Sequence, residues 1–509
     1  MKISNSHGLS AGFLKSGLVE SIDTEQVMIS LRKASVYSGA SANLWLRKRG
    51  GQIKYRPLMG PGSHTRFRAG KNIFRVIGSW DGLDYECLLQ LSEKSLSWKW
   101  SVDILNNSDE DLVLDLIYVQ DVGLKAAGSG TVNEYYVSQY LERRILDDSV
   151  YGSVICCRQN MKEAGGYPWL MIASVNGAVA ASTDGMQFYG RTFRQSGIPE
   201  GILSETLGGE CAGESSVVVL QERAFSLSAG KRHTSAFVAK FMRNHRSATS
   251  ISDLDRLPGL VREFSRQRVP GDKDHWMRPL TNMFNHPEIL HADELSEAEL
   301  DRFFGNERRH GEIHRGKLIS FFSGDNNYIM LREKESLVDR PHGHIMQAAA
   351  GFTPDERIMS TTSFAFGVFN SHLTQGNTNF NTLLSVCNSQ FNLSPATGQR
   401  IFVEIDGKLR LLGVPSAFES GLSNCRWIYK YGDRCFQVRS WTSVRSPQVF
   451  MDFRVLNGEG VRLLVTHDFD NLNGWRVLPG DADESRIIVP DQGSIIAGRF
   501  PGARFRITA

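Results

Sequence analysis

The stretch SWKWSVDILNNSDE, Ser97 to Glu110, alternates apolar and polar side chains and decides the fold class. Apolar residues stand at every second position with polar residues between them: Trp98, Trp100, Val102 and Ile104 against Lys99, Ser101 and Asp103. A period of two is that of an antiparallel strand with one buried face. The asparagines and the serine that follow supply turn chemistry, so this stretch predicts a strand and a turn.

Comparable short apolar runs, broken by glycine-rich turns, continue to about residue 245. Many short strands without helices between them favour a β-sandwich over alternating β-α units. Between residues 246 and 315 the apolar spacing changes to three and four, which is helical. There Ser296 and Glu299 form a capping box, and Gly305 can end the helix that they begin.

Strands return from residue 316. Asp406 and Gly407 lie between two alternating runs, which is a strong hairpin signal. We therefore predict a mainly β chain with two β-sandwich domains, residues 1–245 and 316–509, joined by a short helical connector, residues 246–315. The strand-like pattern still runs at the C-terminal end, so we expect the second domain to be incomplete there.

The balance of charges in the sequence does not favour nucleic acid or a membrane as a partner. The chain has 509 residues, with 58 Lys plus Arg against 55 Asp plus Glu, and a formal net charge of +3 without basic runs. Neither nucleic acid nor a membrane is therefore expected as a partner. Because the sequence contains no apolar stretch of membrane-helix length and no secretory signal, we expect a cytoplasmic protein.

Several kinds of chemistry lack a motif in the sequence. The seven cysteines include no C-x-x-C pair, which favours free thiols over a thiolate zinc site. The glycine patterns of serine hydrolases, P-loops and dinucleotide-binding folds are missing as well. THDFDN offers Asp468 and Asp470 as a carboxylate pair of the glycosidase kind, although such pairs are more often turn or surface groups.

The stretch FGVFNSHLTQGNTNFN, Phe366 to Asn381, mixes amides, a histidine and aromatic rings. This mixture suits a sugar, because amides pair with vicinal hydroxyls and rings stack on the apolar face of a pyranose. The alternative is an ordered loop whose polar side chains bind neighbouring backbone. The candidate residues for carbohydrate binding or an interface are Asn370, His372, Gln375, Asn377 and Asn379.

A second candidate lies in DRPHGHIM, Asp339 to Met346, where Arg340 precedes His342 and His344. Two histidines two residues apart on a strand share a face and could share an ion, but zinc needs a third and a fourth ligand. No fixed further ligand is visible in the sequence, so we expect no metal site. A structural turn and a ligand-facing or interface loop remain as alternatives.

Resemblance to a known family runs through essentially the whole chain. It is carried by NLWLRKRG (43–50), GNERRHGEIHRGKLISFF (305–322), VDRPHGHIM (338–346) and FGVFNSHLTQGNTNFNTLLSVCN (366–388). These stretches resemble the 1,2-β-oligoglucan phosphorylases of glycoside hydrolase family 94, a cellobiose phosphorylase-like and glycosyltransferase 36-like group. The resemblance implies domains of the supersandwich type and a cytoplasmic enzyme of carbohydrate metabolism.

The implied reaction is the phosphorolysis of β-1,2-glucooligosaccharides to α-glucose 1-phosphate. Inorganic phosphate is the co-substrate of that full-length enzyme, and neither a cofactor nor a metal is expected. In the family an (α/α)6 barrel follows the β domains and carries the catalytic residues, and the present sequence has no counterpart of it. We therefore expect no catalytic residue here, and a non-catalytic β portion that is inactive alone.

Several alternatives stay open for such a portion. It could serve in a split enzyme beside a separately encoded catalytic barrel, act as a stand-alone β-glucan-binding protein, or be a truncated, inactive gene product. The expected partners are a β-glucooligosaccharide, that separate barrel, or a second copy of the chain. An aromatic cluster between residues 426 and 441 could form such an interface or belong to the core: Trp427, Tyr429, Tyr431, Phe436 and Trp441.

Overall fold

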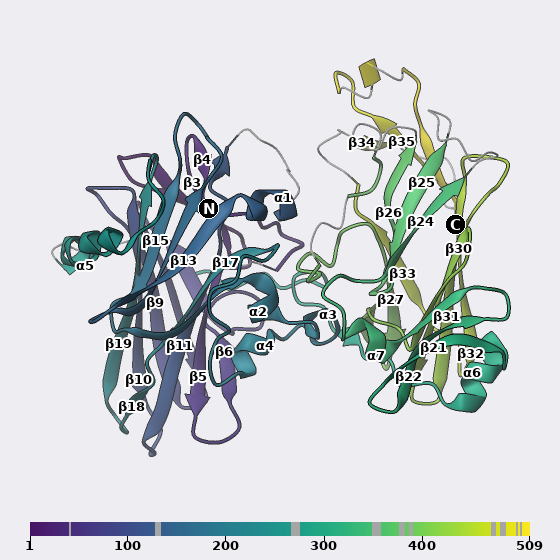
Figure 1. The fold of residues 1–509 in the computed structure, drawn as a ribbon, viewed down its shortest axis with the longest axis horizontal. Helices are drawn as coiled ribbons and strands as arrows, with labels where there is room; N and C mark the ends of the chain where they lie inside the picture. The colour runs from purple at the N-terminus through teal and green to yellow at the C-terminus, as the bar shows by residue number, and fades with distance from the viewer. Residues whose placement is uncertain are drawn as a thin grey trace. The chain divides into compact units, whose positions relative to one another are not determined.

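The structure is a computed structural model. It describes residues 1–39, 42–127, 134–265, 275–348, 358–375, 382–385, 390–469, 475–478, 485–494, 497–498 and 501–508. The chain forms two compact units, Met1–Phe193 with Ile198–His286, and Arg194–Gly197 with Pro287–Ala509. Both are built from strands (Figure 1), which confirms the prediction of a mainly β fold, and the described residues form no barrel of helices.

The first unit contains two sheets. The five-stranded sheet has the order β1 (Lys2–Ser4), β2 (Leu9–Phe13), β3 (Val19–Thr24), β4 (Val27–Met28) and β12 (Lys125–Ala126). The 14-stranded sheet has the order β6 (Lys54–Pro57), β5 (Asn43–Arg49), β11 (Leu112–Asp121), β17 (Ser216–Glu222), β16 (Ala178–Asp184), β14 (Gly152–Gln159), β15 (Trp169–Ser174), β19 (Arg232–Met242), β10 (Ser97–Asn106), β9 (Leu83–Leu91), β8 (Ile73–Trp80) and β7 (Arg66–Ala69), with β13 (Leu141–Asp148) on β14 and β18 (Phe225–Leu227) on β11.

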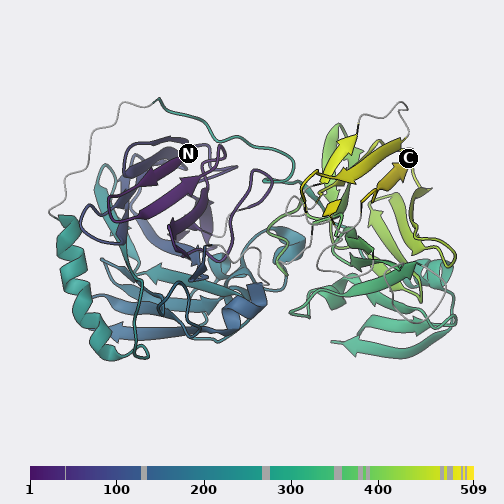
Figure 2. The ribbon, with the colours of Figure 1, turned by 90° about the horizontal axis from the view of Figure 1, so that it is seen from above.

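Strand β10 shows why the alternating pattern folds as it does. Trp98 and Trp100 are 1% and 2% exposed and lie in the main core of the unit. The opposite face is partly covered too, because the helix α5 (Leu257–Ser265) packs on this sheet (Figure 2) and the Lys99 ammonium lies 5.8 Å from the ring centre of Phe264. That burial lowers the pKa of Lys99.

The short helices of the first unit lie between its strands. They are α1 (Glu134–Gln139), α2 (Gly185–Tyr189), α4 (Glu200–Leu203) and the 3-10 turn η1 (Ile251–Arg256), which leads into α5. The residues predicted to form a helical connector, 246–315, are divided between the units. Leu257, Leu260 and Phe264 of α5 pack on the first unit, whereas α6 (Glu297–Phe304) packs on the second, because each helix has one apolar face to bury.

The second unit packs two seven-stranded sheets. The first has the order β20 (Ile289–Leu290), β28 (Lys408–Leu412), β27 (Gln399–Ile405), β26 (Val368–Gln375), β25 (Met359–Phe364) and β24 (Gly343–Ala348), with β33 (Leu463–His467) on β27. The second has the order β21 (Arg308–His314), β22 (Lys317–Ser323), β23 (Tyr328–Leu331), β29 (Ala417–Ser420), β30 (Asn424–Tyr431), β31 (Arg434–Thr442) and β32 (Val449–Asn457). A three-stranded sheet holds β34 (Trp475–Leu478), β35 (Ser485–Pro490) and β36 (Phe505–Thr508).

Two local signals of the sequence are confirmed in this unit. Asp406 and Gly407 have φ angles of 51° and 73° and join β27 to β28, as a two-residue hairpin turn requires. Ser296 caps α6: its hydroxyl accepts from the Glu299 amide at 3.3 Å, and the Glu299 carboxylate accepts from the Ser296 amide at 2.7 Å. Gly305 ends the helix with a φ of 79°.

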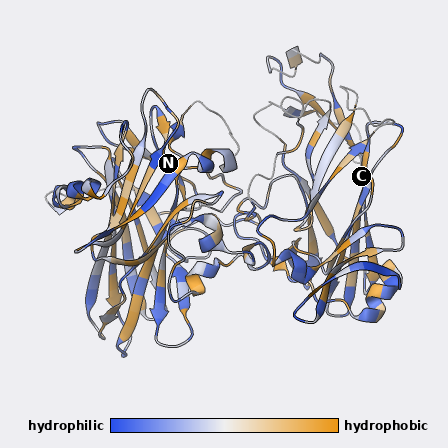
Figure 3. Cartoon of the chain, in the orientation of Figure 1, coloured by the Kyte–Doolittle hydropathy of each residue, from blue (hydrophilic) through white to orange (hydrophobic). Residues whose placement is uncertain are grey.

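The core of the second unit lies between its two large sheets, and Figure 3 shows apolar residues along the strands of both units. Trp427, Tyr429 and Phe436 are fully buried in it. The interface prediction is therefore wrong for these three residues, because their strand faces point into the sandwich. Tyr431 and Trp441 keep partial exposure.

Two general findings concern the described ranges. No helix among them is long and apolar enough to cross a membrane. No cluster of three or more His, Cys, Asp or Glu side chains within them could hold a metal ion.

Six cysteines in this part of the chain are free thiols, and burial raises the pKa of Cys157 to about 12. Cys387 lies outside the described residues.

Candidate functional site

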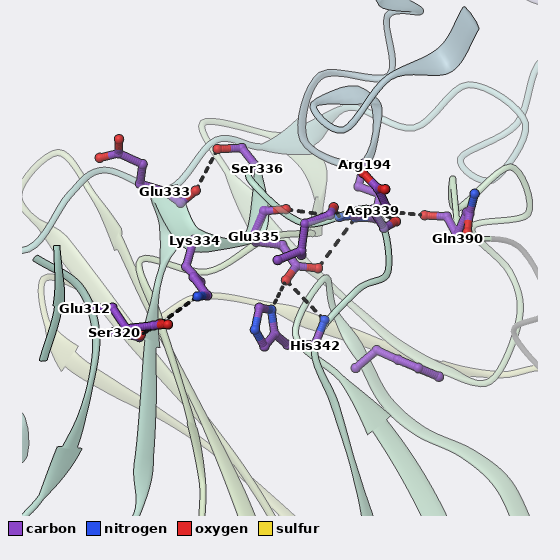
Figure 4. A network of polar contacts seen from close by, with 12 residues as sticks. Arg194, Glu312, Ser320, Glu333, Lys334, Glu335, Ser336, Asp339, His342 and Gln390 are labelled. Carbon is purple, nitrogen blue, oxygen red and sulfur yellow. Dashed lines mark hydrogen bonds and ion pairs between the residues drawn. The ribbon is translucent and has the colours of Figure 1, made fainter. Parts of the chain in front are cut away.

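A network of buried polar groups surrounds the loop from Glu335 to His342 in the second unit (Figure 4). Two short helices position it: α7 (Arg332–Glu335) ends at Glu335, and α3 (Phe193–Ser196) carries Arg194. Residues Arg194–Gly197 belong to the second unit although the chain on either side of them belongs to the first. The network therefore joins residues that are far apart in sequence.

Arg194 holds the loop through its backbone carbonyls. The guanidinium is 1% exposed. One terminal nitrogen donates to the Asp339 and Gln390 carbonyls at 3.1 and 3.2 Å, and the other to the Glu335 and Val338 carbonyls at 3.0 and 2.9 Å. The planar fork of arginine suits this task, because it presents several N–H groups in fixed directions. Arg194 is thus a clamp on the turn after α7.

Glu335 links this clamp to His342. Its carboxylate is fully buried, with Oε1 3.5 Å from Nε of Arg194. Oε2 accepts from the His342 amide at 3.2 Å and lies 2.8 Å from Nδ1 of the same residue. The imidazole also stacks on Tyr328, with ring centres 6.1 Å apart. A carboxylate acceptor at Nδ1 places the ring proton there, so Nε2 is the acceptor nitrogen of the neutral ring.

His344 and Arg340 have different surroundings from His342. His344 lies on β24 opposite Ser363, and its Nε2 is 3.4 Å from the Leu422 carbonyl. Arg340 is exposed at the tip of the loop. The two histidines therefore have separate partners, and Glu335 and Arg194 hold the backbone of the loop.

The second set of candidates begins on β26. Asn370 is 4% exposed, and its amide nitrogen donates to Gln399 at 2.7 Å while its oxygen accepts from the Thr361 and Ser440 hydroxyls. The Gln399 amide in turn lies 3.0 Å from Nε2 of His467. The polar groups of Asn370 are thus used inside the sandwich, by side chains of three other strands rather than by the backbone of a loop.

The other candidates of this stretch lie in different surroundings from Asn370. His372 has a φ of 49° and is partly buried, which lowers its pKa, and the Ser371 hydroxyl lies 3.2 Å from its Nδ1. Gln375 ends β26 opposite Met359. Asn377, Asn379 and Asp470 lie outside the described residues. Asp468 accepts a hydrogen bond from the Ser385 hydroxyl at 2.7 Å.

The arrangement combines a rigid, buried polar support with a loop tip that offers charged groups. Sequence patterns marked Arg340 and His342 but missed Arg194, Glu335 and Gln390. No spacing rule could have found them, because the contacts join separate segments. Arg194 stands between Phe193 and Gln195, and Glu335 between Lys334 and Ser336, so the neighbouring residues do not mark either side chain as buried.

The comparisons with known proteins agree on both units. A family model described as the SOGP N-terminal domain matches residues 12–238. A model described as the glycoside phosphorylase supersandwich domain matches residues 305–508. Glu335 and His342 lie in the second matched range, whereas Arg194 lies in the first.

A curated 1,2-β-oligoglucan phosphorylase of Listeria innocua serovar 6a is 24% identical over 508 residues, which cover 98% of this chain and 45% of that protein. The chain thus spans less than half the length of this relative. Among solved structures, a polysaccharide lyase has a TM-score of 0.31 at 8% identity over 86% of this chain and 46% of its own. A galactose 1-epimerase from Lactobacillus acidophilus NCFM has a TM-score of 0.26 at 13% identity over 48% of this chain and 94% of its own.

Similarity at these TM-scores does not establish a shared fold or function. The conclusion depends instead on the two domain models, which match in order along the chain, and on the relative that aligns with nearly all of it. This chain is therefore a glycoside phosphorylase-like protein that carries an SOGP N-terminal domain followed by a glycoside phosphorylase supersandwich domain.

Proposed function

We propose that this chain is a non-catalytic β portion of a 1,2-β-oligoglucan phosphorylase-like protein and serves it by binding β-1,2-linked glucooligosaccharide and by assembly with further parts. The observation that carries the proposal is the co-linear match of both domains to one relative, which that match covers for 45% of its length. Inorganic phosphate would be the co-substrate of a complete enzyme, which would act in the cytoplasm.

Within the second unit, the loop tip from Arg340 to His342 is the proposed sugar contact. Arg340 is exposed and His342 is partly exposed, while Glu335 and Arg194 hold the backbone beneath them. Groups that are fixed before binding lose less conformational entropy when they meet a ligand. Hydroxyls of a sugar would pair with the guanidinium of Arg340 and with Nε2 of His342.

Titration calorimetry with sophorose and longer β-1,2-glucans tests the binding. We expect heat of binding with these sugars and none with the β-1,4-linked cellobiose. Arg340→Ala should weaken binding, whereas Arg462→Ala, a matched change at an exposed arginine of the same unit, should not. Absence of binding to every β-1,2-glucan would overturn the binding role.

Phosphorolysis is tested separately with the purified chain, a β-1,2-glucooligosaccharide and inorganic phosphate. We expect no glucose 1-phosphate, because the chain offers no motif for proton donation together with phosphate binding. Release of glucose 1-phosphate by the chain alone would overturn the non-catalytic role while leaving the sugar specificity intact.

A further inference from the structure

Four aromatic rings in the second unit contact one another in sequence across the strands β21, β22 and β23. Phe322 of β22 pairs with Tyr328 of β23, and their ring centres are 5.3 Å apart. His342 stacks on Tyr328 at 6.1 Å, and His310 of β21 makes a T-shaped contact with Phe322 at 6.1 Å. We call these four side chains the ring row, in the order His342, Tyr328, Phe322 and His310.

The ring row lies on the face of the sheet that faces the core, where this face becomes open. Residues two apart along a strand share a face, so Phe322 lies with Ser320, and Tyr328 with Met330. Met330 is fully buried in the core between the two large sheets, and Tyr328 packs against that core. Phe322, in contrast, is 37% exposed, and His310 is exposed. The other large sheet therefore leaves this face uncovered near β21 and β22.

A bulge in β21 brings the last ring into the row. The register of β21 with β22 shifts between Arg309 and Glu312, and His310 between them has a φ of 51°, which residues with a side chain rarely adopt. Arg309 lies opposite Phe322, so in a regular strand the next residue would point to the other face. Bulges re-aim side chains in this way and are frequent beside functional sites. The irregular strand thus adds a ring at the open end of the row.

Charged groups lie beside the ring row. Glu312 is opposite Ser320 in the sheet, and its carboxylate accepts from the Lys334 ammonium at 2.5 Å and from the Ser320 hydroxyl (Figure 4). The hydrogen bond from Lys334 lowers the pKa of Glu312, and the nearby His342 adds to this lowering. The open part of the face therefore combines aromatic rings with an ammonium group and an ionised carboxylate.

Two polar groups of the ring row itself have hydrogen-bonding capacity to spare. Nδ1 of His342 faces the buried Glu335 carboxylate. Within the part of the chain that the structure describes, neither Nε2 of His342 nor the Tyr328 hydroxyl makes a hydrogen bond. An apolar protein segment on this face would cover these groups without pairing them, which costs free energy. A sugar pairs such groups through its hydroxyls while its apolar face stacks on the rings.

We propose that the ring row binds an oligosaccharide of several sugar units, with one unit at His342 and the following units on Tyr328 and Phe322. This inference rests on the proposed sugar contact at Arg340 and His342, and it adds that the site prefers a longer chain to a disaccharide. Neighbouring ring centres are 5.3 and 6.1 Å apart, close to the width of a pyranose, so successive units can contact successive rings.

Titration calorimetry on the full chain tests the preference by comparing sophorose with a β-1,2-linked glucopentaose. We expect the dissociation constant of the pentaose to be lower by about tenfold or more, because only the longer sugar reaches Phe322. Phe322→Ala should reduce this ratio to about threefold or less. Phe322→Leu, which keeps an apolar side chain but no ring, should reduce it equally, whereas Phe322→Trp should preserve it.

Phe450 of β32 provides the matched control. It is 39% exposed and lies on the opposite face of the same sheet, because its neighbour Met451 packs against the core. Phe450→Ala should leave the ratio unchanged, and circular dichroism with melting temperature reports whether each variant is folded.

Three outcomes overturn the ring row while the sugar contact at Arg340 and His342 stands. They are equal affinity of the original chain for the two sugars, a Phe322→Ala variant that keeps the full preference, and an equal loss of affinity for both sugars in that variant. Absence of binding to either sugar by the original chain instead overturns the proposed function, and the ring row with it.

Discussion

Two buried arginines, one in each unit, neutralise their charge in different ways. Arg47 of β5 donates to both carboxylate oxygens of Asp115 on the neighbouring strand β11, at 2.8 and 2.6 Å, and both side chains are fully buried. Arg194 instead donates to four backbone carbonyls, and its carboxylate neighbour Glu335 lies 3.5 Å away. Arg47 also donates to the Ile202 and Ser204 carbonyls at 3.0 and 2.7 Å, so it holds two strands and the end of α4, whereas Arg194 holds a loop.

The difference shows what each unit needs from a buried charge. Asp115 also accepts from Arg49 at 2.9 Å and from Gln221 at 3.1 Å, so it is the centre of a network inside a continuous sheet. Around Glu335 the carbonyls of an irregular turn need donors, because no ladder supplies them. We therefore expect the burial of Arg47 to depend on its carboxylate partner more strongly than the burial of Arg194 does.

The largest expected effect is that of Asp115→Asn. Removing this charge leaves the buried Arg47 guanidinium without its counter-ion, which costs about 3–5 kcal/mol of the free energy of unfolding. Urea denaturation measures the loss. Asp81→Asn is the control, because Asp81 pairs with Lys48 at an exposed site and such pairs contribute about 1 kcal/mol or less. Equal losses for the two variants would contradict the network.

Glu222→Gln should stabilise the first unit at alkaline pH. Burial raises the pKa of Glu222 to about 8, from 4.5 in an open chain. Between these values the folded state holds a proton that the unfolded state has released, so the free energy of unfolding falls as the pH rises from 4.5 to about 8. Glutamine does not ionise, so the Glu222→Gln variant should lack this fall in the free energy of unfolding.

We expect the Glu222→Gln variant to be more stable than the original by about 2–4 kcal/mol at pH 9, and the gain to shrink toward pH 4. Urea midpoints across this pH range measure it. Glu93→Gln at an exposed site is the control and should show no such trend. A gain independent of pH would mean that the fold does not raise the pKa of Glu222, and it would remove the contrast between paired and unpaired carboxyls.

Glu335→Gln should cost less than Asp115→Asn, about 1–3 kcal/mol, the range for a buried polar group that loses a partner. Arg194 keeps its four carbonyl acceptors in this variant, and glutamine can still accept from His342. Urea denaturation compares the two variants directly. If Glu335→Gln costs as much as Asp115→Asn, both arginines depend on a carboxylate and the comparison fails.

The smallest effects separate the two histidines of the loop. His342→Ala removes the hydrogen bond to buried Glu335 and the stack on Tyr328, at a cost of about 1 kcal/mol. His344→Ala should stay within about 0.5 kcal/mol, as for other surface positions. Melting curves with and without a chelator complete the test. A lower melting temperature in chelator, lost in both variants, would show that the histidines share a metal.

Local structure was predictable wherever adjacent residues decide it. The alternation around Trp98, the turn at Asp406 and Gly407 and the cap at Ser296 each depend on residues within one element, and each was confirmed. The aromatic cluster near residue 430 could not be assigned from sequence. A core strand and an exposed strand of one sandwich carry the same alternation, and only the packing of the second sheet covers Trp427.

The sequence by itself determined the strands, the hairpin turn, the capped helix and the resemblance to a phosphorylase family. Tertiary structure alone decided that Arg47 meets Asp115, that Arg194 clamps the turn beside His342, and that β32 lies at the edge of its sheet. The physical reason is the distance along the chain over which each effect acts. Propensity and turn chemistry act between neighbours in the chain, whereas the burial of a charge and the exposure of an edge depend on which distant strands the topology brings together.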